Sequence, residues 1–491
     1  MSTQTDNSFQ AIISHAKEYG FVFPSSEIYD GLSAVYDYGP YGSELKKNIR
    51  DYWWKSMTQM HENIVGLDAA IFMHPTTWKA SGHVDNFSDP MIDNKDSNKR
   101  YRVDHLIEAK AEQLALEGKK EEEFALLKSM DELLAADDYG GLKQLIDNNK
   151  IVCAISGTSN WTEIRQFNLM FSTEFGAISS DNPDDNKVYL RPETAQGIFV
   201  NFLNVQKTAR MKIPFGIAQT GKAFRNEIVA RQFIFRMREF EQMEMQFFVR
   251  PGTEGSWYKY WKEERLKWHL SLGIDAAKYR YHDHIKLAHY AKEACDIEYD
   301  FPFGFKEVEG IHSRSDFDLT QHQTFSKKKQ QYFDNDIDEN TGKPYGNYVP
   351  YVVETSIGLD RMFLLILANA YEEETIPKDD GTTDSRVILH LPAKLAPIKL
   401  AILPLTKKDG LPEIAKELMN QCKPYFHCFY EEKDAIGKRY RRQDAIGTPF
   451  CVTIDHQTKE DQTVTIRYRD SMKQERVSLN RIKELVQQEI F

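Results

Sequence analysis

The chain has 491 residues, of which 41% are hydrophobic and 28% charged, a composition typical of a globular protein with two to four domains. No apolar stretch approaches the roughly 20 residues that a membrane helix needs. The polar residues 1–9 have neither the basic start nor the apolar run of a signal peptide, so we expect a cytoplasmic protein without a membrane partner. The net charge of −11 argues against a protein coated in nucleic acid, and a nucleic-acid partner would need local basic patches.

The cysteines are few and widely spaced, without a C-x-x-C pair: Cys153, Cys295, Cys422, Cys428 and Cys451. Such an odd, scattered set is typical of a reducing compartment. It offers no ligand pattern for zinc, so no zinc is predicted.

Residues 105–150 have the apolar periodicity of charged, amphipathic helices and follow a polar run at residues 93–100. This pattern predicts an inserted helical lobe at residues 96–160. Residues 1–95 are then the expected first part of a core that the lobe interrupts.

From residue 165 the pattern changes to short alternating runs at residues 187–191, 215–220, 223–228 and 235–249, which predict strands of an antiparallel sheet. A helix-rich stretch is expected at residues 256–294, an apolar strand at 348–354 and a buried helix at 358–371. The core is therefore predicted to continue over residues 161–392.

Residues 391–397 include two prolines and precede a new strand at 399–403, which helix and strand signals follow to the end of the chain. A domain boundary is expected here, with a separate α/β domain over residues 397–491.

The most informative segment runs from Phe224 to Glu244. Side chains alternate faces along a strand, so Arg236, Arg238, Phe240, Gln242 and Glu244 are predicted to share one face, with Arg225 and Glu227 on the preceding strand. Residues 236–244 would span about 26 Å, enough for a nucleoside triphosphate beside a second small substrate. Arginine forks suit phosphate and a phenyl ring suits a purine. A solvated face of alternating charges would give the same pattern, and this segment alone leaves both interpretations open.

Two other segments favour a site. Arg361 stands at a predicted strand-to-helix transition, and Glu193 ends a strand before a helix cap at Thr194. Either residue alone would be interpreted as part of a surface ion pair, whereas their joint occurrence with the first segment favours chemistry.

Together these segments resemble the signature motifs of class II aminoacyl-tRNA synthetases, most closely the homodimeric glycyl-tRNA synthetases. The second motif is similar to Phe224-Arg225-Asn226-Glu227 with Arg236 to Phe240, and the third to Gly358-Leu359-Asp360-Arg361. The first motif, which belongs to the dimer interface, is identified around Pro40 and in the helix through Trp53 and Trp54.

Glycyl-type features are Thr77 to His83, Arg100 to His105 and Arg191 to Gly197, while Ile436 to Asp444 and Ile446 to Phe450 resemble an anticodon-binding domain. The similarity extends from about Tyr29 to the end of the chain. Two departures stand out. Thr355 occupies a position where many relatives have proline, and residues 93–98 lack the cysteine pairs of some relatives, so zinc is not carried over.

The resemblance implies an α+β fold: an antiparallel sheet core flanked by helices, the helical insertion and a C-terminal anticodon-binding domain. It implies that Arg225 contacts the α-phosphate of ATP, that Arg236 and Arg361 hold the β and γ phosphates, and that Phe240 stacks on adenine. Arg225 and Arg361 are the implied catalytic residues. Mg²⁺ is expected with ATP, and Glu307 is its candidate ligand. The implied ATP site comprises Arg225, Asn226, Glu227, Phe235, Arg236, Met237, Arg238, Glu239, Phe240, Glu307, Val308, Gly358, Leu359, Asp360 and Arg361.

For glycine, the resemblance implies that Glu193, Glu244 and Glu354 pair with the ammonium group. Ser356 would add a hydrogen bond, and Arg102 is a candidate partner of the carboxylate. An ordinary ion pair with a nearby arginine is the alternative role of each glutamate. The implied glycine site comprises Arg102, Glu193, Phe240, Glu241, Gln242, Met243, Glu244, Glu354, Thr355, Ser356, Ile357 and Gly358.

The implied reaction is activation of glycine with ATP and transfer to the 3′ end of tRNA(Gly), by a homodimer. Anticodon contact is expected from the basic run Lys438, Arg439, Tyr440, Arg441 and Arg442, which combines charge with an aromatic ring. Two alternatives remain: a threonyl or prolyl class II synthetase, and an inactive descendant that binds RNA or a protein. The glutamate set argues against the first and the retained arginines against the second.

Overall fold

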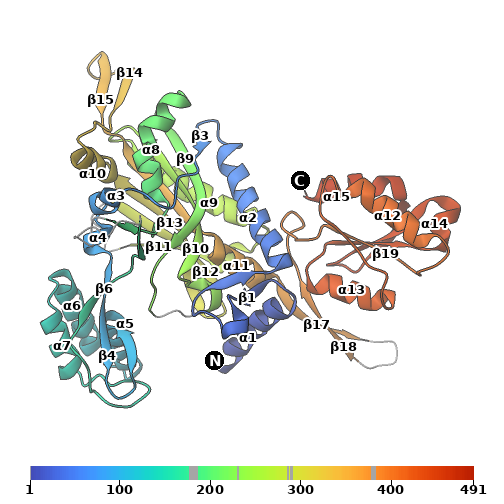
Figure 1. The fold of residues 1–491 in the computed structure, drawn as a ribbon, viewed down its shortest axis with the longest axis horizontal. Coiled ribbons are helices and arrows are strands. Elements are labelled where there is room, and N and C mark those ends of the chain that lie inside the picture. The colour runs from blue at the N-terminus through green and yellow to red at the C-terminus, as the bar shows by residue number, and fades with distance from the viewer. Residues whose placement is uncertain are drawn as a thin grey trace.

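The structure is a computed structural model that describes residues 2–175, 186–228, 232–284, 287, 291–377 and 383–490. Its core is a seven-stranded sheet with the order β11-β12-β13-β16-β10-β9-β3 (Figure 1). Neighbouring strands are antiparallel except β3 and β9, which are parallel. The strands are β3 (Ile64–Gly66), β9 (Phe215–Phe224), β10 (Glu239–Val249), β11 (Tyr279–Asp283), β12 (Glu293–Phe301), β13 (Gly304–Ser315) and β16 (Tyr351–Gly358).

One face of this sheet is covered by helices. The side chains of Met243, Met245 and Phe247 on β10 point to this face and are fully buried. They pack against α2 (Pro40–Thr58), α9 (Glu254–Leu270) and α11 (Leu359–Ala370). Since α11 is apolar almost all round, it is buried between the sheet and α2.

The opposite face is covered only in part. Phe248 and Val352 belong to this face and pack against α8 (Ala195–Thr208) and α10 (Phe317–Ser326). Further along the same strands, this face carries Phe240, Gln242 and Glu244 in place of apolar side chains. Because no helix of the described residues covers that stretch, the polar residues border a hollow.

The inserted lobe contains α5 (Val103–Leu116), α6 (Lys120–Ala135) and α7 (Tyr139–Asn148) around Ile107, Leu126 and Leu142. A small sheet joins it to the core, with β4 (Ser88–Asn94) between β5 (Lys99–Arg102) and β6 (Arg165–Asn168). The chain therefore enters and leaves the lobe through the paired strands β4 and β6.

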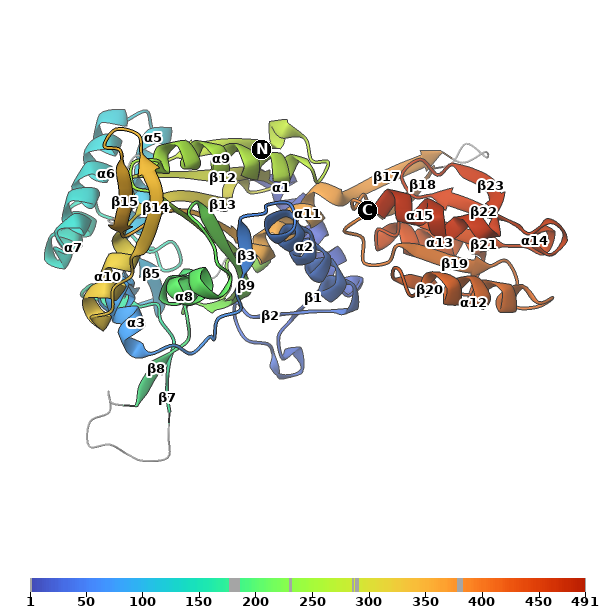
Figure 2. The same cartoon turned by 90° about the horizontal axis from the view of Figure 1, so that it is seen from above.

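The C-terminal unit has a five-stranded mixed sheet with the order β20-β19-β21-β22-β23 and lies at the far end of the core from the lobe (Figures 1 and 2). Its core includes Leu400, Ile402, Val452 and Ile466. Its elements are β19 (Leu400–Pro404), α12 (Leu411–Cys422), β20 (Cys428–Tyr430), α13 (Ile436–Ala445), β21 (Phe450–Ile454), α14 (His456–Asp461), β22 (Thr463–Tyr468), β23 (Gln474–Ser478), η4 (Leu479–Arg481) and α15 (Ile482–Ile490).

Helix α2 joins the C-terminal unit to the core. The side-chain amide of Asn48 donates to the carbonyls of Leu395 and Ala396 at 3.0 and 3.2 Å. The buried His15 ring nitrogen lies 2.8 Å from the carbonyl oxygen of Ala445. Such contacts fix the unit to the N-terminal part of the chain.

Smaller elements complete the core region. They are α1 (Ser2–Glu18), β1 (Val22–Pro24), η1 (Glu27–Tyr29), β2 (Tyr36–Tyr38), α3 (Pro75–Ala80), α4 (His83–Asn86), β7 (Ser172–Glu174), β8 (Lys187–Tyr189), η2 (Phe233–Phe235), η3 (Ala276–Lys278), β14 (Tyr332–Asp338), β15 (Lys343–Tyr348), β17 (Tyr371–Pro377) and β18 (Thr383–Leu389). Among the described residues, no helix is long and apolar enough to cross a membrane.

The antiparallel sheet is confirmed, but several predicted elements differ in detail. The strand expected from residue 235 begins at Glu239, because Gln232 and Phe233 adopt left-handed φ values of 65° and 57° and form a tight turn first. Residues 225–228 lie beyond the end of β9 rather than in a strand of their own. In the helix-rich stretch expected over residues 256–294, α9 ends at Leu270, shortly before Gly273 with φ of 79°, and two strands follow.

Candidate active site

A hollow of about 340 Å³ occupies the uncovered stretch of the sheet. It is bordered by the loop after β9, the start of β10, the middle of β13, and the junction of β16 with α11. Its lining combines carboxylates, arginines and aromatic rings: Glu193, Arg225, Glu227, Ile234, Phe235, Arg236, Met237, Phe240, Glu241, Gln242, Glu244, Glu307, Gly310, His312, Arg314, Glu354, Ser356, Gly358, Asp360 and Arg361.

Glu354 is the most strongly held carboxylate of the hollow. Arg314 donates to its Oε2 at 2.9 Å, His312 Nδ1 lies 2.8 Å from its Oε1, and Gln246 donates to Oε2 at 2.6 Å. Burial alone raises the pKa of a carboxyl, but here the charges of Arg314 and His312 outweigh it and hold the pKa of Glu354 well below its usual range. Glu354 is therefore ionised.

Glu244 lies beside it with the opposite protonation. Burial, together with the negative charges of Glu354 and Glu193, raises the pKa of Glu244 well above the ordinary value. Thr194 donates its hydroxyl to Glu244, and Gln246 donates at 3.2 Å, but no cation pairs with it among the described residues. The folded chain consequently keeps the proton of Glu244 to a higher pH than that of an ordinary glutamate.

Glu193 completes the group from the segment before α8. His83 Nε2 lies 3.4 Å from its carboxylate, and Gln196 donates to it at 3.0 Å. Although burial opposes ionisation, His83 and Arg314 lower the pKa of Glu193 to about 2. One end of the hollow thus combines two carboxyls of lowered pKa with one of raised pKa.

The other end is cationic and aromatic. The Arg225 guanidinium lies 5.3 Å from the centre of the Phe240 ring, and its Nε donates to the Pro192 carbonyl at 3.1 Å. The Arg361 guanidinium lies 4.4 Å from the ring centre of Phe235 and pairs with Glu307 at 3.0 Å. Such stacking keeps each planar guanidinium in one orientation while leaving donors for a ligand.

The alternation predicted for Arg236 and Arg238 is wrong, because both residues precede β10. Arg236 still borders the hollow from the turn after η2. Arg238 instead turns away and donates from Nε to the Glu227 carbonyl at 2.9 Å. Two more candidates lie outside the hollow: Asn226, whose N–H donates to the Leu169 carbonyl, and Glu239, which pairs with Lys222.

Five further candidates have buried side chains outside the lining of the hollow. Four of them belong to the core beneath the helix-covered face. Strand alternation places Met243 and Ile357 there. Val308 reaches that face at the register shift between β12 and β13, and Leu359 begins α11. Only the backbone of these residues can take part in the site. The five are Met243, Val308, Thr355, Ile357 and Leu359, of which Thr355 is the one outside that core cluster.

Arg102 lies at the start of α5, outside the lining of the hollow. It forms a bidentate pair with Asp104 at 3.1 and 2.6 Å and contacts Asp89 at 3.0 Å. Its donors are therefore engaged within the lobe in this conformation.

The lining includes residues that sequence reasoning missed: Ile234, Gly310, His312 and Arg314. The last three alternate along β13 and share one face, a signal present in the sequence. A side chain at Gly310 would collide with the His312 ring, since an added Cβ would lie 2.8 Å from its Cε1.

In the C-terminal unit, the basic run falls on α13. The prediction that Arg439 contacts the anticodon is wrong, because its side chain is buried. Arg439 is 1% exposed and donates to the carbonyls of Pro404 and Glu431 at 2.8 and 3.0 Å. The Tyr440 hydroxyl bonds Thr453 at 2.6 Å, and Arg442 pairs with Glu431 at 2.7 Å. Lys438 is exposed on the same helix. Consecutive basic residues point to all sides of a helix, so only some of their side chains face solvent.

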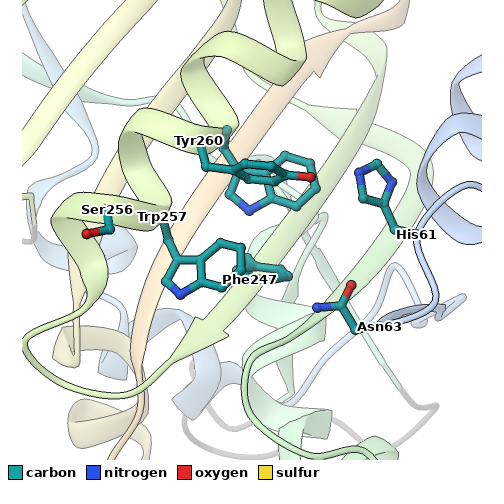
Figure 3. A pocket seen from close by; sticks show the side chains of 7 residues that line it. His61, Asn63, Phe247, Ser256, Trp257 and Tyr260 are labelled. Atoms are coloured by element: carbon teal, nitrogen blue, oxygen red, sulfur yellow. The ribbon is translucent and has the colours of Figure 1, made fainter.

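Two other features lie apart from this chemistry. A hollow on the helix-covered face, between α9 and the turn before β3, is bordered by Phe247, Trp257, Tyr260 and Trp261 with Ser256, His61 and Asn63 (Figure 3). None of its lining residues is an arginine or a carboxylate, so it does not suit a nucleotide. Among the described residues, Glu372, Glu374 and His390 are the one group of at least three such side chains close enough to share a metal ion, and they lie outside the active-site hollow.

Three family models match the chain. Residues 171–370 match the tRNA synthetase class II core domain (G, H, P, S and T), and residues 399–489 match an anticodon binding domain. Residues 89–126 and 116–169 match glycyl-tRNA synthetase insertion domain 1. The antiparallel sheet and its arginine-lined hollow accordingly define a class II aminoacyl-tRNA synthetase.

Curated relatives narrow the class. The chain is 52% identical to the glycine--tRNA ligase of Chlorobaculum tepidum over 97% of this chain and 98% of the relative. It is 49% identical to that of Treponema denticola and 50% identical to that of Borreliella burgdorferi, each over 98% of this chain and 97% of the relative. The chain belongs to the glycine--tRNA ligase family, which confirms the resemblance seen in the sequence.

The unequal protonation of Glu244 and Glu354 predicts opposite effects of isosteric substitution. Unfolding releases the proton of Glu244, so wild-type stability falls as pH rises above the ordinary carboxyl range, and Glu244→Gln removes that loss. Glu354→Gln removes one of the two buried carboxylates that pair with Arg314 and lowers the free energy of unfolding by about 3–5 kcal/mol. Thermal unfolding of the wild type and of both variants at pH 5.5 and pH 8 measures these stability changes. A Glu244→Gln variant that loses as much stability as Glu354→Gln at pH 8 contradicts the assignment.

Proposed function

We propose that the chain activates glycine with ATP to glycyl-adenylate and transfers glycine to the 3′ end of tRNA(Gly), releasing pyrophosphate and AMP. The observation that carries this proposal is the division of one hollow into a cationic, aromatic end and a carboxylate end. Triphosphate and purine suit the first end, and an ammonium group suits the second.

At the nucleotide end, Arg225 contacts the α-phosphate, Arg236 and Arg361 hold the β and γ phosphates, and Phe240 stacks on adenine. The glycine carboxylate attacks the α-phosphorus, a P–O bond forms to glycine, and the bond to the leaving pyrophosphate breaks. No protein nucleophile is needed, because these residues act by position and charge. A hydroxyl of the terminal tRNA ribose then attacks the glycyl carbonyl, and AMP leaves.

Mg²⁺ would be held by Glu307 together with the phosphates. Glu307 pairs through Oε2 with Arg361 at 3.0 Å. Burial, and then the negative charge of Glu307, raises the pKa of the neighbouring Asp296. The positive charge of a hard cation here would offset the negative charges of Glu307 and Asp296. Carboxylate oxygens are the ligands that such a cation prefers. When bound, it would neutralise phosphate charge.

At the other end, Glu193, Glu244 and Glu354 face the ammonium group of glycine, and Ser356 adds a neutral hydrogen bond. Arg102 could approach the substrate only by leaving Asp104 and Asp89. Side chains packed against the substrate Cα reject larger amino acids by collision, so an editing site is unnecessary.

The remaining partners are tRNA and a second copy of the chain. Anticodon contact is assigned to the exposed side of α13, with Lys438 as its clearest candidate, and Lys438→Glu is expected to weaken tRNA binding. A homodimer is proposed through the segment around Pro40. Analytical ultracentrifugation would then give a molecular mass of twice 57.1 kDa. We retain residues 1–95 and 161–392 as the core, 96–160 as the lobe and 397–491 as the anticodon-binding domain, in a cytoplasmic enzyme.

The first test is exchange of labelled pyrophosphate into ATP with purified chain, Mg²⁺ and each of the twenty amino acids. Exchange is expected with glycine alone and to fall at least a hundredfold in Arg361→Ala, because a phosphate ligand is lost. The matched control is Arg280→Ala, an arginine of the same sheet on its edge strand β11, outside the hollow. Exchange with a different amino acid would refute glycine specificity.

Glycine binding should release a proton. An ammonium group near Glu244 favours its ionised form, so the carboxyl must lose the proton it keeps in the free protein. The KM for glycine is therefore expected to fall as pH rises, until Glu244 is ionised without substrate. Calorimetry of glycine binding in two buffers of different ionisation enthalpy measures the released proton. Equal heats in both buffers contradict the prediction, and Glu244→Gln should remove the proton release while weakening binding.

A further inference from the structure

Helix α2 places a lysine directly behind the nucleotide end of the hollow. Lys46 Nζ lies 2.7 Å from Asp360 Oδ1, 3.4 Å from Glu241 Oε2 and 4.2 Å from the centre of the Tyr38 ring. Its side chain is 12% exposed, and those of Asp360 and Glu241 are 3% and 8% exposed. This mostly buried cation therefore faces two carboxylates and an aromatic ring at once.

Asp360 joins four elements of the core. Its Oδ1 accepts from Lys46 on α2 and from the Tyr38 hydroxyl on β2. Its Oδ2 accepts from the backbone N–H of Glu241 on β10 at 2.7 Å, and Asp360 itself lies in the first turn of α11. Charge-assisted bonds of this kind fix both the carboxylate and the backbone that donates to it.

Asp360 and Glu241 are each adjacent in sequence to a residue of the proposed ATP site. Arg361 follows Asp360 on α11, and Phe240 precedes Glu241 on β10. A shift of Asp360 would thus move the guanidinium that faces the phosphates, and a shift of the Glu241 backbone would move the ring that faces adenine. Displacements of about 1 Å are enough to lower rates a hundredfold.

We propose that Lys46 is a positioning residue of the ATP site, which holds Asp360 and Glu241 and through them aligns Arg361 with Phe240; this rests on the proposed function. Without the lysine, Asp360 keeps only uncharged donors, and Glu241 keeps only Arg50 at 2.7 Å. Two mostly buried carboxylates would then repel each other with less compensation and separate the elements that carry them.

The matched control lies next to it on the helix. Lys47 is 55% exposed and pairs with Asp51 on the solvent side at 2.7 Å, so Lys47→Met removes the same charge without touching the network. Lys46→Arg keeps the charge in a different shape. Tyr38→Phe deletes only the hydroxyl that donates to Asp360.

The experiment measures the Kd of Mg·ATP by calorimetry and the separate KM values for ATP and glycine in pyrophosphate exchange. Lys46→Met is expected to raise the Kd and KM for ATP at least tenfold and the KM for glycine less than twofold. Lys46→Arg should recover part of the loss, and Lys47→Met should match the wild type.

Unchanged ATP binding in a folded Lys46→Met variant, or an equal rise in both KM values, overturns the inference. If that variant does not fold, Tyr38→Phe decides in the same way, with a smaller expected rise of about threefold in the KM for ATP. Wild-type chain that binds no Mg·ATP overturns the proposed ATP site and the role of Lys46 together, whereas binding without glycine-dependent exchange counts against the proposed reaction alone.

Discussion

The compensation of buried negative charge on one sheet face is the constraint on which the site depends. Glu354 is ionised because Arg314 and His312 reach it at 2.9 and 2.8 Å. Burial, together with the charge of Glu354, raises the pKa of Glu244. Arg314 is itself fixed by Asp318 on α10 at 2.9 Å. The carboxylate end therefore has one arrangement of charges before any substrate arrives, which is the preorganisation that recognition of a small ligand requires.

The same strands serve a core and a site because their side chains alternate. On β10, Met243 and Met245 pack beneath helices, while Gln242 and Glu244 face the hollow. A slip of one residue in the pairing of β10 with β16 would exchange the two sets, so the hydrophobic packing that stabilises the sheet also fixes the register of the site. The register of the sheet therefore couples its stability to the chemistry of the site.

Much of this could be predicted from the sequence, because period-2 alternation and the motifs near Arg225 and Arg361 are local signals. The positions of Arg236 and Arg238 could not be predicted. The left-handed backbone at Gln232 and Phe233 forms a turn that delays the start of β10, and no glycine in the sequence indicates this turn. Arg439 shows the second limit: a basic residue in a basic run is interior because carbonyls of Pro404 and Glu431 converge on it. Nor did spacing identify Lys46, which lies more than 300 residues along the chain from Asp360.

Helix α2 illustrates why such distant pairs matter. Lys46 and Arg50 are four residues apart and so share the face that holds Asp360 and Glu241, while Asn48 and Tyr52 share another face. Asn48 donates to the segment that precedes the C-terminal unit, and Lys394 of that segment reaches the Tyr52 hydroxyl at 3.0 Å. Because an α-helix moves nearly as a rigid rod over so few turns, the position of the C-terminal unit and the alignment of the nucleotide end are set by the same element.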